Sequence, residues 1–173
     1  MELVFNSFRM KHIAYLSLGS NIGDRRSALQ EAIERIGKSV GTVVRQSAFY
    51  ETEPWGFDSD NLFLNAAVCV ETALCPRCLL ETTQRIEREL GRTKANKRQM
   101  GNESVTAGSS PKQGRSGGGS YKDRPIDIDI LLYDDLTIDE PDLKIPHPLM
   151  YEREFVMKPL REIMKNPSLS REG

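Results

Sequence analysis

The sequence predicts an α+β domain in which helices pack on one face of an antiparallel sheet and long loops leave that sheet. Two observations predict it. Strand-like and helix-like apolar patterns follow one another along the 173 residues in the order β-α-β-β-α-β. Two polar segments rich in turn formers, residues 52–61 and 92–123, interrupt these patterns. The length suits one domain spanning residues 1–173 with a sizeable core.

The first half of the chain predicts three strands and one helix. Residues 13–18 are expected to form the first strand, and Asp24 is expected to cap the helix that follows. A second strand is expected at about 42–51. Residues 62–71 are apolar enough to form a central third strand, and the loop at 52–61 precedes them.

The second half predicts a helix, a long loop, a strand and a last helix. The helix begins at Pro76, a residue favoured in the first turn, and ends at Gly91. A structureless loop as long as residues 92–123 indicates function or disorder in a compact domain. A strand at 126–133 and a helix at about 151–163 complete the chain. The whole order is the ferredoxin-like split βαβ arrangement.

Composition and charge restrict the classes of function. The formal net charge is −1, so no general basic surface indicates nucleic acid or an anionic membrane as a partner. No apolar stretch approaches the length of a membrane span. The start lacks the charged-then-apolar order of a signal peptide, so a cytoplasmic protein is expected. Residues 1–10 are expected to be an N-terminal extension and residues 165–173 a frayed tail.

The three cysteines are Cys69, Cys75 and Cys78, and an odd number without a signal argues against a disulfide scaffold. Cys75 and Cys78 have the spacing of a redox motif at the expected start of a helix. The strand–motif–helix context of such motifs is only partly present, so the redox interpretation is the less favoured one. Zinc is less favoured still, because no second ligand pair has suitable spacing.

Asp127 and Asp129 are the candidate chemical centre. Side chains alternate along a strand, so both carboxylates project from the face opposite the neighbouring isoleucines. Two like charges this close disfavour each other's ionisation unless a cation lies between them. Hard oxygen ligands with few protein partners suit Mg²⁺ held jointly with a substrate phosphate, which Arg124 could also reach. The alternative is a strand with a solvated polar face.

Several separated segments, each weak alone, form a specific pattern in this order. They are residues 15–21, 47–54, 63–67, 84–87, 123–129 and 146–147. Through them the chain resembles the 6-hydroxymethyl-7,8-dihydropterin pyrophosphokinase family of folate biosynthesis, over about residues 13–163. Members of that family are ferredoxin-like α+β domains with three mobile catalytic loops, which agrees with the expected order of elements.

The resemblance implies that pyrophosphate passes from ATP to the hydroxymethyl group of the dihydropterin, giving AMP and the pterin diphosphate. It implies that Asp127 and Asp129 hold two Mg²⁺ ions that bridge the ATP phosphates. The residues agree with this, since phosphoryl transfer needs positioning and charge neutralisation more than a protein nucleophile. A metal pair supplies both.

Further roles are implied residue by residue. The implied catalytic arginines are Arg92 and Arg124. The implied ATP-binding residues are Gln84, Glu87, Lys94, His147 and Arg153. The implied pterin-binding residues are Thr52, Pro54, Trp55, Phe63, Asn65, Tyr121 and Phe155. Without the resemblance, Phe63 and Phe155 would be assigned to the core, Trp55 would be a loop anchor and Asn65 a strand-end asparagine. The remaining alternatives are solvated helix positions for Gln84, Glu87 and Arg92, and a turn position for His147.

The chain departs from the family pattern in and near the third loop. Lys94 stands where the family often has an arginine, and Ser120 occupies a position that is usually basic. Pro148 replaces a residue that is often aromatic. These departures concern the ATP contacts of the 92–123 loop and leave the reaction class unchanged.

Two other classes of function are considered. One is a non-catalytic ferredoxin-like binding module for RNA or a small effector, and the other is a degenerate enzyme that regulates a folate-pathway partner. An RNA-recognition domain should carry paired aromatic residues and a basic sheet face. Here the corresponding strand carries Asp127 and Asp129, which would repel phosphate without a metal. Other folate enzymes are possible partners.

Overall fold

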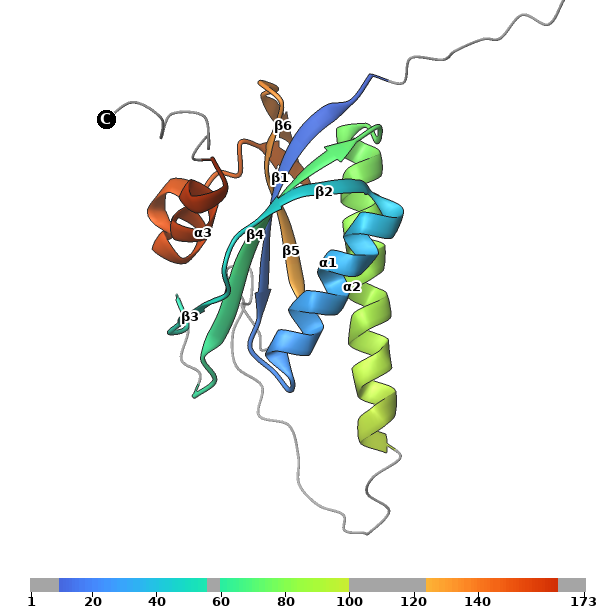
Figure 1. Ribbon diagram of the computed structural model, residues 1–173, viewed down its shortest axis with the longest axis vertical. Coiled ribbons are helices and arrows are strands. Elements are labelled where there is room, and N and C mark those ends of the chain that lie inside the picture. Colours follow the sequence, from blue (N-terminus) through green and yellow to red (C-terminus); the bar gives the residue numbers. More distant parts are fainter. Residues whose placement is uncertain (1–9, 56–59, 100–123, 165–173) are drawn as a thin grey trace, which may run out of the picture.

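An antiparallel sheet with helices on both sides forms the frame of the molecule (Figure 1). The computed structural model describes residues 10–55, 60–99 and 124–164. Its elements are β1 His12–Ser20, α1 Arg25–Ser39, β2 Gly41–Gln46, β3 Tyr50–Thr52, β4 Phe63–Thr72, α2 Pro76–Gln99, β5 Asp127–Tyr133, β6 Ile138–Glu140, β7 Leu143–Ile145, η1 Met150–Glu152 and α3 Glu154–Met164. No helix in these ranges is long and apolar enough to cross a membrane.

The sheet has the strand order β2-β4-β1-β5, and β3 pairs with the start of β4. Neighbouring strands are antiparallel. The central strand β1 places Leu18 opposite Ala66 on one side and opposite Ile128 on the other. The predicted α+β class with an antiparallel sheet is thereby confirmed.

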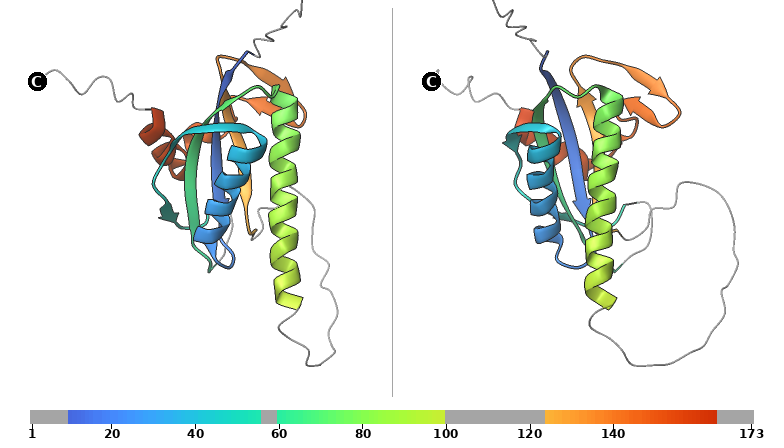
Figure 2. Two further views of the ribbon diagram at one scale, coloured as in Figure 1. Left: turned by 45° about the vertical axis from the view of Figure 1, so that its right-hand side comes forward. Right: turned by 90° about the vertical axis from the view of Figure 1, so that its right-hand side faces the viewer.

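The prediction that the helices pack on one face of the sheet was wrong. Helices α1 and α2 cover one face, and α3 covers the other (Figure 2). Val156, Leu160 and Ile163 of α3 pack with Ala67 of β4 and Leu131 of β5. Both faces of the central strands are apolar here, so each face needs a cover that removes it from water. The expected helix at 151–163 is divided into η1 and α3, with Arg153 between them.

The expected second strand at 42–51 is also divided. It consists of β2 and β3, which both pair with β4. Between them the Ser47 hydroxyl donates to the Ala48 carbonyl and accepts from the backbone N–H of Ala67. A serine side chain that competes for backbone partners interrupts a ladder in this way.

The predicted start of α1 agrees with the structure, whereas the predicted end of α2 does not. Asp24 caps α1 as predicted, because its side chain accepts from the backbone N–H of Ser27 at 3.0 Å. Helix α2 does not end at Gly91, however, but continues to Gln99. Residues 92–99, predicted as loop, are therefore helical. An interior glycine costs a helix only about 1 kcal/mol, which the neighbouring good helix formers outweigh.

After β5, the chain forms a short hairpin and then returns to contact β5. β6 and β7 form a hairpin of their own beside the main sheet. The Ile145–Pro146 peptide bond after it is cis. The backbone N–H of His147 then donates to the carbonyl of Leu131 at 2.9 Å, on the edge strand β5. This contact leads the chain across β5 toward the face that α3 covers.

Candidate active site

A pocket opens at one end of the sheet, on the face that α3 covers. Register brings its strand residues together, because Gly19 of β1 lies opposite both Asn65 of β4 and Asp127 of β5. Ser17 lies opposite Asp129. Because Ser17 and Gly19 are small, β1 leaves room for a pocket between the aspartates of β5 and Asn65 of β4. The hollow spans about 500 Å³ of space, open solvent included.

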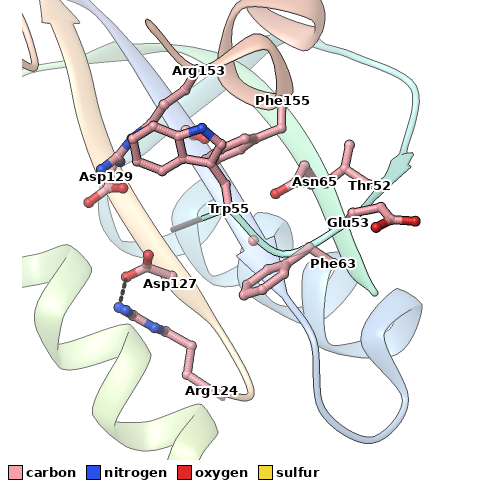
Figure 3. Close-up of a pocket in the computed structure, with 12 residues that line it drawn as sticks. Thr52, Glu53, Trp55, Phe63, Asn65, Arg124, Asp127, Asp129, Arg153 and Phe155 are labelled. Atoms are coloured by element: carbon pink, nitrogen blue, oxygen red, sulfur yellow. Dashed lines mark hydrogen bonds and ion pairs between the residues drawn. The ribbon is translucent and has the colours of Figure 1, made fainter. Parts of the chain in front are cut away.

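The two aspartates project into this pocket from the same face of β5, as the alternation of the strand predicts (Figure 3). Burial and, after it, the charge of the nearby Asp129 together raise the pKa of Asp127 to about 6. Burial also raises the pKa of Asp129, which the charge of Arg153 opposes. Two partly desolvated carboxylates this close favour a proton or a cation between them.

Two arginines stand on either side of the acidic pair. Arg124 precedes β5, and its guanidinium donates to Asp127 at 2.8 Å. Its backbone N–H donates to the side-chain oxygen of Asn21 at 2.9 Å, which fixes the start of the strand. Arg153 lies between η1 and α3 and is only 4% exposed. A buried guanidinium beside Asp129 can neutralise an anionic ligand at this end of the pocket.

The other end of the pocket is aromatic. The rings of Trp55 and Phe155 have centroids 6.3 Å apart, and the Arg153 guanidinium lies 4.9 Å from the Trp55 ring (Figure 3). Phe63 of β4 lines the same space. A flat heterocycle gains dispersion and quadrupole interactions among such rings.

One amide is held at the aromatic end. The Asn65 side-chain nitrogen donates to the Thr52 hydroxyl at 2.8 Å, and Asn65 is 3% exposed. This bond orients the amide so that its carbonyl oxygen and second N–H can serve a ligand. Thr52 and Asn65, each implied by the resemblance to bind the pterin, thus form a hydrogen-bonded pair, and their role in binding stays a prediction.

Glu87 of α2 approaches β5 from its edge. Its carboxylate accepts from the backbone N–H of Ile128 at 2.7 Å. Burial and, to a lesser extent, the charges of Asp127 and Asp129 raise the pKa of Glu87 to about 7. Three carboxyl groups therefore compete for protons at this end of β5. Gln84, one turn earlier on α2, is exposed.

His147 belongs to an adjoining groove, which Asp129 also lines. Its Nδ1 accepts from the backbone N–H of Leu149 at 3.3 Å, in the assigned ring orientation. Burial and the charge of Arg153 lower the pKa of His147, which keeps the ring neutral at neutral pH. Asp129 therefore faces two hollows, the pocket and this groove.

Most of the predicted site residues meet in the pocket. They are Thr52, Trp55, Phe63, Asn65, Arg124, Asp127, Asp129, Arg153 and Phe155. Pro54, Gln84 and Glu87 do not line it, and His147 lines the groove. Arg92 and Lys94 lie on the C-terminal part of α2. Tyr121 lies outside the described residues.

Three pocket residues were missed by the sequence prediction. Ser17, Gly19 and Glu53 line the pocket but carried no predicted role. Ser17 and Gly19 belong to a segment that resembles the family. The feature that could have indicated their position in the pocket is their small size on an otherwise apolar strand. Glu53 lies between Thr52 and Pro54, which were both predicted to bind the pterin. Its position between them was therefore the signal for its place in the pocket.

The donor set agrees with a metal that is shared with a ligand. Among the residues that the structure describes, no group of three or more histidine, cysteine, aspartate or glutamate side chains has the arrangement of a metal site. Asp127 and Asp129 offer two carboxylates whose mutual repulsion a divalent cation would relieve. Mg²⁺ commonly takes one or two carboxylates and completes its shell with water and phosphate oxygens.

Charge-neutralising groups at one end of a pocket and ring-binding groups at the other can bring an anionic phosphate donor to a flat acceptor. Fold and site thus define the class as a phosphate-group transferase. A family model described as 7,8-dihydro-6-hydroxymethylpterin-pyrophosphokinase (HPPK) matches residues 15–165. The chain therefore belongs to this pyrophosphokinase family.

Individual relatives agree. A Porphyromonas gingivalis protein named 2-amino-4-hydroxy-6-hydroxymethyldihydropteridine pyrophosphokinase is 47% identical over 152 residues, which cover 87% of this chain and 90% of that protein. A Bacillus subtilis protein of the same name is 41% identical over 155 residues, covering 89% of this chain and 79% of that protein. The predicted family and the predicted transfer of pyrophosphate in folate biosynthesis are confirmed.

Solved structures are similar in fold. An HPPK-DHPS structure described as a complex with substrates has a TM-score of 0.62 at 15% identity, covering 89% of this chain and 40% of that chain. A Plasmodium falciparum HPPK-DHPS triple mutant has a TM-score of 0.59 at 18% identity, covering 93% and 42%. This chain thus spans about two fifths of those longer chains.

Proposed function

We propose that this chain transfers pyrophosphate from ATP to the hydroxymethyl group of 6-hydroxymethyl-7,8-dihydropterin, releasing AMP, with Mg²⁺ held at Asp127 and Asp129. One observation carries the proposal. The pocket has an aromatic and amide end and, beside it, a carboxylate and arginine end. A pterin at the first end would present its hydroxymethyl group toward phosphates at the second.

At the pterin end, the chain binds and orients the acceptor. Phe63, Trp55 and Phe155 supply the ring surfaces, and Asn65 supplies an amide that can both donate and accept. Thr52 fixes that amide through its hydroxyl. Packed against a bound pterin, these rings would exclude water, which would compete with the hydroxymethyl oxygen for the pyrophosphoryl group.

At the phosphate end, bound Mg²⁺ would neutralise the phosphate charge and align the attacking and leaving oxygens. Asp127 and Asp129 provide its carboxylate ligands, and they must be ionised to do so. Arg153 and Arg124 neutralise further charge on the transferring group. His147 is a proposed ATP contact, because it lines the adjoining groove together with Asp129. Helix α2 supplies the other proposed ATP contacts, which are Gln84, Glu87, Arg92 and Lys94.

The finer description of the fold is also a proposal. We infer a variant of the ferredoxin-like arrangement, supported by the sheet order β2-β4-β1-β5 and by α1 and α2 on one face. β3, α3 and the β6–β7 hairpin are additions to it.

The cytoplasmic location, the Mg²⁺ requirement and association with other folate enzymes stay predictions. A Pisum sativum relative, 35% identical over 149 residues, is named a mitochondrial folate synthesis bifunctional protein, and this chain covers 24% of it. Such fused relatives support association. A binding module for RNA is not favoured, because β5 turns two carboxylates toward the pocket.

Purified protein mixed with ATP, Mg²⁺ and 6-hydroxymethyl-7,8-dihydropterin should form AMP and the pterin diphosphate, measured by anion-exchange chromatography. Omission of Mg²⁺, with a chelator present, should stop turnover, because the phosphates then repel Asp127 and Asp129. Formation of ADP alone, or no turnover by folded protein, would contradict the proposal.

Single substitutions test the metal role. Asp127→Ala and Asp129→Ala should each lower kcat by about 100-fold or more, as is typical when a group that stabilises the transition-state charge is removed. Asp135→Ala is the matched control, because this aspartate is exposed on the turn after β5 and should leave kcat unchanged. Equal turnover of all three variants would exclude the metal role of the pair.

A further inference from the structure

Two cysteines at the start of α2 lie away from the pocket and have no part in the proposed function. Cys75 and Cys78 are exposed, whereas Cys69 is buried in β4. The pocket lies where Gly19 pairs with Asn65, and the cysteines follow the opposite end of β4, where Thr72 pairs with His12. Figure 1 shows α2 beginning at that far end of the sheet.

The first turn of α2 brings the two sulfurs into contact. The Leu79 N–H donates to the Cys75 carbonyl at 2.8 Å, which makes Cys75 the residue that caps the helix. Its Sγ also accepts from the backbone N–H of Cys78 at 3.2 Å. The two Sγ atoms are 2.6 Å apart. A disulfide bond has a length of about 2.05 Å, so bonding would need little movement of either side chain.

The surroundings give the two thiols different roles. The Cys78 side chain and the backbone N–H groups of Cys78 and Arg77 lower the pKa of Cys75 by hydrogen bonding to its sulfur. The contact with Cys75 raises the pKa of Cys78. A thiolate at a helix N-terminus is the usual attacking group of a dithiol, and the second cysteine resolves the mixed disulfide.

The charged side chain between the two cysteines in the sequence, that of Arg77, pairs with the β6–β7 hairpin. The Arg77 guanidinium forms ion pairs with Glu140 and, at 2.6 Å, with Asp142, which ties the first turn of α2 to the β6–β7 hairpin. In the described part of the chain, no third histidine, cysteine or acidic side chain joins the pair in a metal-binding arrangement. Thiol–disulfide chemistry therefore fits this pair better than a zinc site.

We propose that Cys75 and Cys78 form a redox-active dithiol, which a low-molecular-weight disulfide such as glutathione disulfide oxidises to an intramolecular disulfide. The Cys75 thiolate attacks one sulfur of glutathione disulfide, forms a mixed disulfide and expels one glutathione thiolate. Cys78 then loses its proton, attacks the Cys75 sulfur and expels the second glutathione. The protein loses two protons and two electrons, and glutathione disulfide takes up both to become two glutathione molecules.

Mass spectrometry of the full chain tests this. Reduced protein, freed of reductant, is incubated with glutathione disulfide at neutral pH, quenched with acid, alkylated after unfolding and digested with trypsin. Cleavage after Arg77 separates the two cysteines, so their disulfide links two peptides. We expect loss of alkylation at Cys75 and Cys78, gain of the linked peptide, and full alkylation of Cys69. Dithiothreitol should restore both thiols.

Serine variants separate the two roles. Cys78→Ser should hold glutathione on Cys75, because no resolving thiol remains. Cys75→Ser should react with glutathione disulfide about tenfold more slowly than Cys78→Ser, because it lacks the activated thiolate. Circular dichroism checks that both variants fold. Persistent alkylation of both cysteines in the wild type, or equal rates for the two variants, would overturn the proposal.

Discussion

In the ligand-free protein, the ionised forms of the acidic pair on β5 are unfavourable, and this favours binding of a cation. Asp127 and Asp129 are partly desolvated and face each other's charge, so their ionised forms are disfavoured. Arg124 offsets only part of this at Asp127. A bound divalent cation would reverse the penalty, so binding of the metal should release protons.

Asp127→Asn should change the pH dependence of stability in a defined direction. The pKa of Asp127 rises from 3.8 to about 6 on folding, so the folded protein holds a proton that the unfolded chain releases. Its carboxylate therefore costs stability increasingly between about pH 4 and pH 6. Relative to the wild type, the variant's free energy of unfolding should rise by on the order of 1–3 kcal/mol over this window.

Urea unfolding of the metal-free proteins, with a chelator present, measures this difference at each pH. The comparison with the wild type cancels the shared groups that do not interact with Asp127, such as Asp134 and Asp142, whose pKa values are lowered. A difference that stays constant from about pH 4 to pH 7 would contradict the raised pKa.

Gly19 is the residue that allows Asn65 to sit in the pocket. A Cβ at position 19 would lie 3.2 Å from the Asn65 side-chain oxygen and 3.8 Å from the Phe63 ring. Gly19→Ala should therefore displace the amide and raise KM for the pterin by about tenfold, the value of one lost hydrogen bond. KM for ATP should stay nearly unchanged.

Steady-state kinetics with each substrate varied in turn gives both constants. Gly37→Ala in α1 is the control, because its Cβ would meet nothing within 4 Å. It should leave both KM values unchanged and stabilise the helix slightly. A similar rise of KM for ATP and for the pterin in Gly19→Ala would assign Gly19 a general structural role.

At the scale of elements, α3 is the addition that completes the pocket. Its apolar side chains bind it to the sheet, and the residues at its start, Arg153 and Phe155, line the pocket. Glu162 adds polar contacts, since its carboxylate accepts from the Tyr50 hydroxyl at 2.6 Å and from the Ala48 N–H at 3.1 Å. The helix thereby also fixes β3, which ends at Thr52.

Leu160→Ala tests how firmly α3 is docked. Leu160 is fully buried against the second face of the sheet, so the substitution should lower the free energy of unfolding by about 2–5 kcal/mol. Met164→Ala, at a position that is 48% exposed, should change it by less than about 0.5 kcal/mol. Denaturant unfolding measures both. Similar small effects would mean that α3 contributes little to the folded state.

At the scale of the whole molecule, the pocket joins parts that are distant in the sequence. β1, β3, β4 and β5 each supply residues, and the start of α3 closes the aromatic end. A ligand that contacts all of them should stabilise the folded state as a unit, since it binds the folded chain and not the unfolded one.

Thermal unfolding with and without 6-hydroxymethylpterin, a non-reacting analogue, measures this coupling. At a hundredfold excess over its Kd, the analogue should stabilise the wild type by about 2.7 kcal/mol. Phe155→Ala should lose about tenfold in affinity, or about 1.4 kcal/mol of that gain. Tyr151→Ala, an exposed aromatic of η1 that does not line the pocket, should keep it. Equal gains in both variants would exclude Phe155 from the pterin site.

Local sequence patterns correctly predicted the features that depend only on neighbouring residues in the chain. Alternation along β5 placed both aspartates on one face, and the Asp24 cap fixed the start of α1. The end of α2 was predicted wrongly, because a single glycine is too small a penalty to stop a helix. The break between β2 and β3 was missed, because it depends on the contact of Ser47 with Ala67 in another strand.

The sequence by itself determined the class of fold, the family and the acidic pair, because each is written in short segments of the chain. Only the tertiary structure decided which side chains meet. Strand register placed Ser17 and Gly19 beside the aspartates, and the docking of α3 on the second face brought Arg153 and Phe155 to them. Register and docking depend on contacts between distant segments, which local periodicity does not encode.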